Sequence, residues 1–242
     1  MTDYAAPHDR KGAARSPSGR LPLPLLLLLL LIAGLLGLAA APAAYMLWPR
    51  WPDSVQIDAP ALPITVGGVV FNVPPATIRV RMQRRPGAQP RIDLVFLWPS
   101  LAPPDPAVRP TLAAPNALGE RVFVTVAASD GTLPPLERLK IIYPRYVAVD
   151  MAEGSDGLVT RAFRNGTPYQ GEDLIYDAGA PDRFLLRCTR KVGMTPGMCL
   201  HERRVGGADI TVRFPREWLV DWATVAQNLD RLIASLRPVA AG

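Results

Sequence analysis

The sequence predicts an α+β protein in which an N-terminal transmembrane helix precedes a β-rich extracytoplasmic domain with antiparallel sheets and a C-terminal amphipathic helix. Residues 21–49 carry no charge, several later segments alternate apolar and polar residues, and the last segment spaces apolar residues by three and four. We therefore expect a disordered cytoplasmic tail (1–20), a signal-anchor helix (21–48), a juxtamembrane linker (49–62) and an extracytoplasmic domain (63–242).

The uncharged run has the length and composition of a membrane span. It contains seven consecutive leucines, Leu25–Leu31. At about 1.5 Å per residue, a helix from Pro24 to Trp48 would reach about 37 Å, which exceeds a hydrocarbon core of about 30 Å. Four basic residues precede the run and place the N-terminus inside, while three aromatic residues at its far end suit the membrane interface: Arg10, Lys11, Arg15 and Arg20; Tyr45, Trp48 and Trp51.

A cleavable signal peptide is the alternative, because Ala41-Pro42-Ala43 resembles a small-x-small cleavage site. A signal-peptide core holds about 7 to 15 apolar residues, and this run is longer, which favours an anchor. Both interpretations export the C-terminal part. A cleaved chain would be a soluble secreted domain instead of a single-pass membrane protein.

The composition indicates a bacterial envelope protein. Lysine occurs only at positions 11, 140 and 191, so arginine dominates the 27 basic residues, as GC-rich coding produces. The first 20 residues carry +2 and Arg50 adds one, so only +3 of the net charge of +6 belongs to the exported part. The high pI therefore does not predict nucleic-acid binding. In a two-membrane envelope the exported part would lie in the periplasm.

Cys188 and Cys199, the two cysteines of the chain, both fall in the exported part. An oxidising compartment favours their pairing, and His201 is the one exported histidine, which disfavours a zinc cluster. We expect a disulfide that closes a loop of about 12 residues and contributes about 3 kcal/mol.

The first half of the exported domain reads as four strands. Residues 64–66 and 69–73 flank Gly67-Gly68, which predicts a hairpin. Thr77 to Gln83 alternates and predicts a half-buried strand, and residues 91–98 predict another after the turn at Pro86-Gly87. The proline-rich stretch from Pro99 to Asn116 excludes regular structure and predicts a long surface loop that is also a candidate partner-binding surface.

The second half combines further strands with two helices. Residues 121–128 predict a strand, and Pro134-Pro135 opens a helix that ends near Tyr143. Weaker strands follow over 146–151 and 157–163, then a turn at Asn165-Gly166 and a short edge strand over 174–176. Residues 183–190, 199–204 and 209–214 predict a meander with the disulfide across its first hairpin and a turn at Gly206-Gly207.

Pro215 opens the predicted final helix, whose apolar stripe is spaced by three and four residues: Leu219, Trp222, Ala226, Leu229, Ile233 and Leu236. Val225 and Leu232 widen this face beyond a coiled-coil seam, so we expect it to pack on the sheet of its own domain.

Local motifs predict no catalytic residue, metal site or cofactor. His201 and Glu202 are neighbours on a predicted strand and so point to opposite faces, and Asp150 to Gly157 lacks the spacing of a calcium loop. Four arginines are candidates for an anion-binding surface: Arg79, Arg81, Arg203 and Arg204.

The sequence therefore favours a non-enzymatic binding or assembly module, anchored in the inner membrane with its C-terminal domain in the periplasm. The expected partners are the lipid bilayer and either another envelope protein or an anionic glycan or lipid, and no nucleic acid is expected. The alternative is a membrane-tethered envelope hydrolase that uses paired carboxylates brought together by the fold.

Overall fold

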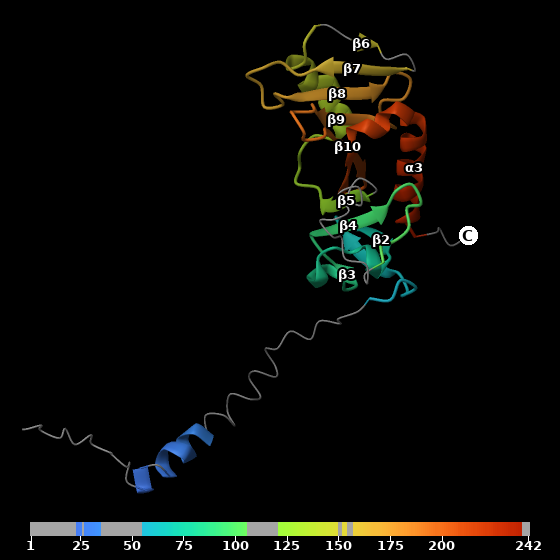
Figure 1. Cartoon of the computed structure of the whole chain (residues 1–242). Coiled ribbons are helices and arrows are strands. Elements are labelled where there is room, and N and C mark those ends of the chain that lie inside the picture. The colour runs from blue at the N-terminus through green and yellow to red at the C-terminus, as the bar shows by residue number, and fades with distance from the viewer. Residues whose placement is uncertain are drawn as a thin grey trace, which may run out of the picture. The chain divides into compact units, whose positions relative to one another are not determined.

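The computed structural model describes residues 23–25, 27–34, 55–105, 121–149, 152–153 and 157–238 (Figure 1). The chain divides into two units, Met1–Trp51 and Pro52–Gly242. In the first unit, residues 23–25 and 27–34 are helical. No helix made of described residues is long and apolar enough to cross a membrane. Most of the expected span lies outside these residues, as do Tyr45, Trp48 and Trp51, so the span stays a prediction.

The second unit is built, in its described part, on an eight-stranded antiparallel sheet of order β4-β5-β11-β10-β9-β8-β7-β6 (Figure 1). The pairing of β5 with β11 joins strands from the two halves of the domain into one sheet. The bounds are β4 (Arg91–Leu97), β5 (Arg121–Ala128), β6 (Ala152–Glu153), β7 (Leu158–Ala162), β8 (Glu172–Asp177), β9 (Leu185–Thr189), β10 (Met198–Val205) and β11 (Ala208–Pro215).

A smaller sheet of order β2-β1-β3 comprises β1 (Leu62–Val66), β2 (Val69–Val73) and β3 (Gly87–Ala88). The predicted β1–β2 hairpin is confirmed, and Gly67 and Gly68 adopt the positive φ angles of 57° and 77° that its turn requires. This turn lies against the β10–β11 turn. A Cβ atom on Gly67 would lie 2.0 Å from the carbonyl oxygen of Gly207, so only glycine fits there.

Helix α3 (Trp222–Ser235) covers the apolar face of the large sheet after a short 3-10 helix, η6 (Arg216–Asp221). Asp221 caps α3 by accepting a hydrogen bond from the backbone N–H of Thr224. The buried side of α3 joins β1, β2 and the central strands in one core: Val225, Ala226, Leu229, Leu232 and Ile233. The predicted packing of the apolar stripe on the domain's own sheet is confirmed, but the α-helix begins at Trp222 and not at Pro215.

The opposite face of the sheet is partly covered by three consecutive short helices, α2 (Pro135–Glu137), η4 (Arg138–Ile142) and η5 (Tyr143–Arg145). They form a second apolar cluster with β8 and β9 that contains Tyr143, Phe163, Leu174 and Leu185. A helical segment beginning at Pro134-Pro135 was expected here, and the structure confirms it.

Two strand predictions are wrong, and a third is wrong in the position of its strand in the sheet. Thr77–Gln83 is not a strand but two 3-10 turns, η1 (Pro75–Thr77) and η2 (Arg81–Gln83), between which Ile78 makes a single bridge to Leu94. The alternation was misleading because Val80 and Met82 are exposed. Residues 174–176 belong to β8, which lies between β7 and β9 and is not an edge. Over 146–149 only Val147 pairs, by one bridge to Phe163.

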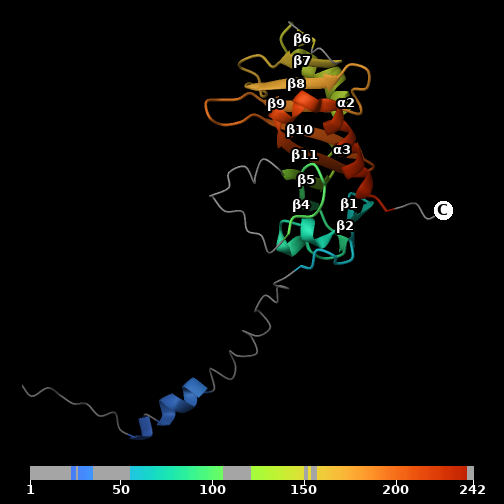
Figure 2. The ribbon, with the colours of Figure 1, turned by 45° about the vertical axis from the view of Figure 1, so that its right-hand side comes forward.

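The C-terminal meander β9–β10–β11 is confirmed, and so is the disulfide. Cys188 and Cys199 are direct cross-strand partners on β9 and β10, and their Cα atoms lie 4.0 Å apart. Both side chains are buried beside the core under α3. The disulfide therefore closes the base of the β9–β10 hairpin, whose loop extends away from the sheet (Figure 2).

We predict that Leu229→Ala lowers the free energy of unfolding by about 2 to 5 kcal/mol, because the leucine is 1% exposed and its removal leaves a cavity. Chemical denaturation of the Pro52–Gly242 unit measures this change. The control is Gln227→Ala on the exposed side of α3, for which we expect less than about 0.5 kcal/mol. Equal unfolding free energies for the two variants would contradict the assigned core.

Candidate functional site

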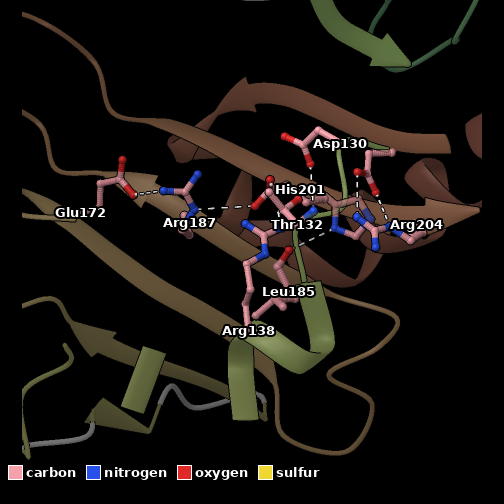
Figure 3. Close-up of polar contacts among 10 residues, drawn as sticks. Asp130, Thr132, Arg138, Glu172, Leu185, Arg187, His201 and Arg204 are labelled. Carbon is pink, nitrogen blue, oxygen red and sulfur yellow. Dashed lines mark hydrogen bonds and ion pairs between the residues drawn. The ribbon is translucent and has the colours of Figure 1, made fainter. Parts of the chain in front are cut away.

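Charged side chains gather on the sheet face opposite α3, at the end of β5 (Figure 3). They surround a hollow of about 230 Å³ between the sheet and the loop that follows β5. The lining is mainly polar: Asp130, Thr132, Arg138, Glu202, Asp209 and Thr211 contribute, together with Ala127, Ala128, Pro135, Arg203 and Ile210. We call this the polar hollow.

Glu202 on β10 lies between two arginines beside the polar hollow. Arg138 of η4 contacts one carboxylate oxygen at 3.2 Å, and Arg187 of β9 lies 3.6 Å from the other (Figure 3). Arg187 also donates to Glu172 of β8 at 3.0 Å. All four side chains are about four-fifths buried. Removing one partner from a network of this kind costs about 3 to 5 kcal/mol, so it holds η4 on the sheet.

The remaining carboxylates of the polar hollow are also engaged. Arg204 donates hydrogen bonds to both carboxylate oxygens of Asp209, from Nε at 2.7 Å and from Nη2 at 2.9 Å. Asp130 accepts a hydrogen bond from the backbone N–H of Thr132 at 3.0 Å, and Thr132 lowers the pKa of this carboxyl. No group of three or more His, Cys, Asp or Glu side chains among the described residues could hold a metal ion. The polar hollow thus presents fixed, oppositely charged groups suited to polar contacts.

The four arginines predicted to bind anions do not form one surface. Arg79 lies over the ring of Phe123, and Arg81 begins η2. Arg203 and Arg204 are neighbours on β10 and point to opposite faces. Arg203 donates to Asp230 of α3, whereas Arg204 pairs with Asp209. An anion-binding role for these residues stays a prediction.

His201 lies in the middle of the apolar face. Its cross-strand neighbours are Val212 on β11 and Leu186 on β9. The carbonyl oxygen of Leu185 lies 3.2 Å from Nδ1, and because a carbonyl can only accept, Nδ1 carries the proton. Nε2 is buried and has no hydrogen-bond partner among the described residues. Burial, aided by Arg203, lowers the pKa of His201 to about 4, so the ring is neutral at pH 7.

A second surface lies at the other end of the same strands, where β4, β9 and β11 finish and β10 begins. It exposes apolar side chains that the fold does not use: Met194 is 98% exposed, Val220 93% and Val192 75%. Two tryptophans from distant parts of the sequence, Trp98 and Trp218, stack on each other beside Val220. We call this region, comprising Trp98, Val192, Met194, Glu217, Trp218 and Val220, the end surface.

The tryptophans continue a stack of rings that begins in the core. Phe214 of β11 is fully buried and lies 5.9 Å from Trp218, centroid to centroid, with the rings 12° from parallel. Trp218 stacks in turn on Trp98 at 4.4 Å and 18°. Offset stacking of this kind is favourable and fixes both indoles. They line a hollow of about 390 Å³, which we call the indole hollow.

The hairpin loop of the end surface is held from two sides. The disulfide ties its base, and the buried carboxylate of Asp173 on β8 pairs with Arg190 of the hairpin and Arg216 of η6, at 2.8 and 2.7 Å. A second hollow, of about 380 Å³, lies between the loop and η6 and is lined by Lys191, Met194, Pro196, Gly197, Arg216 and Glu217. The disulfide and the ion pairs therefore fix the base of the β9–β10 hairpin, and the exposed tip of its loop extends from this fixed base.

Sequence reasoning identified the cysteines and the hairpin but not the end surface. The two tryptophans meet only because β4, β5 and β11 are neighbours in the sheet, and that order cannot be read from local patterns. Trp98 and Trp218 each follow the end of a strand. This position was the sequence feature that could have pointed to the end surface.

Comparison with known proteins identifies the fold and no family. No family model matches the chain, and neither does any curated protein. The solved structure of Smlt3025, an immunity protein of the Stenotrophomonas maltophilia type IV secretion system, aligns with a TM-score of 0.51 at 15% identity over 74% of this chain and 94% of that one. The Neisseria meningitidis iron-regulated outer membrane lipoprotein FrpD aligns at a TM-score of 0.40 and 7% identity, over 76% and 98%. The first similarity shows a shared fold.

We predict that the domain loses stability as the pH falls from about 6.5 to about 4. In this window the unfolded chain protonates His201 but the folded chain does not, so acid favours unfolding, by an amount on the order of 3 kcal/mol at the lower limit. Denaturant titrations at several pH values measure this loss. His201→Gln should flatten the dependence between pH 6.5 and 4.5, and an unchanged slope in that variant would contradict the assignment.

Proposed function

We propose that this protein is a membrane-tethered envelope module whose exported domain binds a protein partner. The observation that carries the proposal is the end surface, where Val220 lies beside two stacked tryptophans and Met194 lines the adjoining hollow, both side chains being almost fully exposed. Exposed apolar side chains that gather with aromatic residues on a firm base are typical of protein-binding surfaces.

The fold similarity supports one kind of partner. The similar Stenotrophomonas maltophilia protein is an immunity protein of a secretion system. By analogy of fold alone, we propose that the partner is a protein that meets the present domain in the cell envelope, such as a secreted toxin that is neutralised by binding.

The disulfide and the uncharged N-terminal run support the proposed location. A disulfide buried beside the core is maintained in an oxidising compartment, outside the cytoplasm. The run over residues 21–49, preceded by basic residues, favours a span with the N-terminus inside. We therefore propose a single-pass inner-membrane protein with a periplasmic domain.

A hydrolase is the second candidate, because the carboxylates of Glu202, Asp209 and Asp130 line one hollow. Two of them are bound by arginines, Glu202 by Arg138 and Arg187 and Asp209 by Arg204. These contacts use the lone pairs that a catalytic carboxylate would offer to water or substrate. The paired geometry favours a binding role for the polar hollow over a catalytic one.

We predict that a photoreactive amino acid at position 194 of the full-length protein, irradiated in intact cells of its own host, gives an adduct of discrete mass with a protein. The matched control is position 149, where Val149 is 92% exposed but lies outside the end surface. The adduct should form from position 194 and not from position 149. Absence of the adduct, or equal adducts from both positions, would contradict binding at the end surface.

We predict that alkaline phosphatase fused after Gly242 is active in cells and that a fluorescent protein requiring the cytoplasm is dark at the same position. The expected result follows from the uncharged run and the basic residues before it. Replacing Arg10, Lys11, Arg15 and Arg20 by glutamine should reduce the exported fraction. A phosphatase fusion that is inactive in the unsubstituted protein would overturn the proposed location.

A further inference from the structure

We propose that the indole hollow is the recognition pocket for a cationic side chain, lysine or arginine, of the partner protein. This inference rests on the proposed function and names the chemistry of one contact within it. Two features of the hollow carry the inference: its aromatic wall and the carboxylates at its rim.

The aromatic wall is suited to a cation. Trp98 and Trp218 both line the hollow, and Trp218 lies between Phe214 and Trp98 in the stack, so the free ring face is the outer face of Trp98. Tryptophan is the side chain whose ring face attracts ammonium and guanidinium groups most strongly. The stack on buried Phe214 holds the indoles in place before any ligand arrives, so little ordering entropy is lost on binding. Pro99 and Val220 extend the apolar wall, which suits the methylene stem of a long basic side chain.

The charges of the hollow complement a cation. Glu217 and Asp221 are its charged lining residues, and both are acidic. Glu217 forms no ion pair within the described part of the chain, so its charge is available to a ligand. Asp221 caps α3, whose N-terminus carries partial positive charge, and the cap offsets part of that charge. Glu217 is therefore the principal counter-charge.

The basic groups nearby do not oppose this assignment. Lys191 and Arg216 line the neighbouring hollow and not the indole hollow. Arg216 is paired with the buried carboxylate of Asp173 at 2.7 Å. Glu217 lines both hollows and separates the acidic side of the end surface from the basic side. A partner that fits this pattern places its basic side chain on the indoles and an acidic or neutral residue near Lys191.

The test uses N-acetyl-arginine amide as the probe and N-acetyl-citrulline amide as its uncharged counterpart of nearly equal shape. The indole N–H signals of full-length, ¹⁵N-labelled protein in detergent micelles are followed by NMR and assigned with Trp98→Phe and Trp218→Phe. We expect the arginine probe to shift both signals with a dissociation constant on the order of 10 mM, and the citrulline probe to bind about tenfold more weakly. Raising the salt concentration should weaken the binding of the arginine probe and leave the binding of the citrulline probe unchanged.

The double variant Glu217→Gln with Asp221→Asn removes both charges and keeps a residue that caps helices well. It should bind the arginine probe about tenfold more weakly, whereas the control Asp58→Asn with Glu137→Gln, which removes two distant charges, should bind it normally. Equal binding of arginine and citrulline, or unchanged binding by the double variant, overturns the proposal. So does tighter binding of tetramethylammonium, which would indicate a quaternary ammonium headgroup.

The same double variant separates this inference from the proposed function. Combined with the photoreactive residue at position 194, it should give several-fold less of the partner adduct. If the adduct forms at full yield, a partner binds the end surface without a basic contact, and only the inference fails. If no adduct forms even when Glu217 and Asp221 are unchanged, the proposed function fails whatever the arginine and citrulline probes show.

Discussion

Helix α3 and the β1–β2 hairpin cover one face of the large sheet, and the burial of that face organises the whole Pro52–Gly242 unit. The shared core draws side chains from both sheets and from α3, including Phe71, Val124, Phe214 and Leu229. Strand β5 pairs with β11 in this sheet. Burial of the shared face therefore also holds the strands that precede the proline-rich stretch against the C-terminal meander. The polar hollow and the end surface are both positioned by this frame.

The two ends of the central strands have different chemical characters. At one end, arginines and carboxylates satisfy one another and fasten the short helices to the sheet, as Arg138 and Glu202 do. At the other end, two indoles line an open hollow together with Glu217, which forms no ion pair among the described residues. Charges that are already paired contribute little to a new contact, whereas unpaired ones beside an apolar wall contribute more. This contrast is the physical reason for proposing that recognition occurs at the end surface.

Local patterns in the sequence predicted the elements that depend on local physics. The Gly67-Gly68 and Gly206-Gly207 turns, the meander, the disulfide and the buried stripe of α3 all follow from turn chemistry, alternation and spacing. The strand expected over Thr77–Gln83 failed because its alternation is not matched by burial. The indole hollow escaped prediction because Trp98 and Trp218 come together through strand order, a long-range property that no local pattern encodes.

The contact between the β1–β2 and β10–β11 turns also bears on how distant relatives of this chain can be recognised. Gly67 and Gly207 touch backbone to backbone, so a side chain at either position would push the two turns apart. A related chain that retains this contact must therefore carry glycine at both places, although the positions are far apart in sequence. Such a linked pair of glycines is a usable signature where overall identity has fallen too low for alignment by sequence.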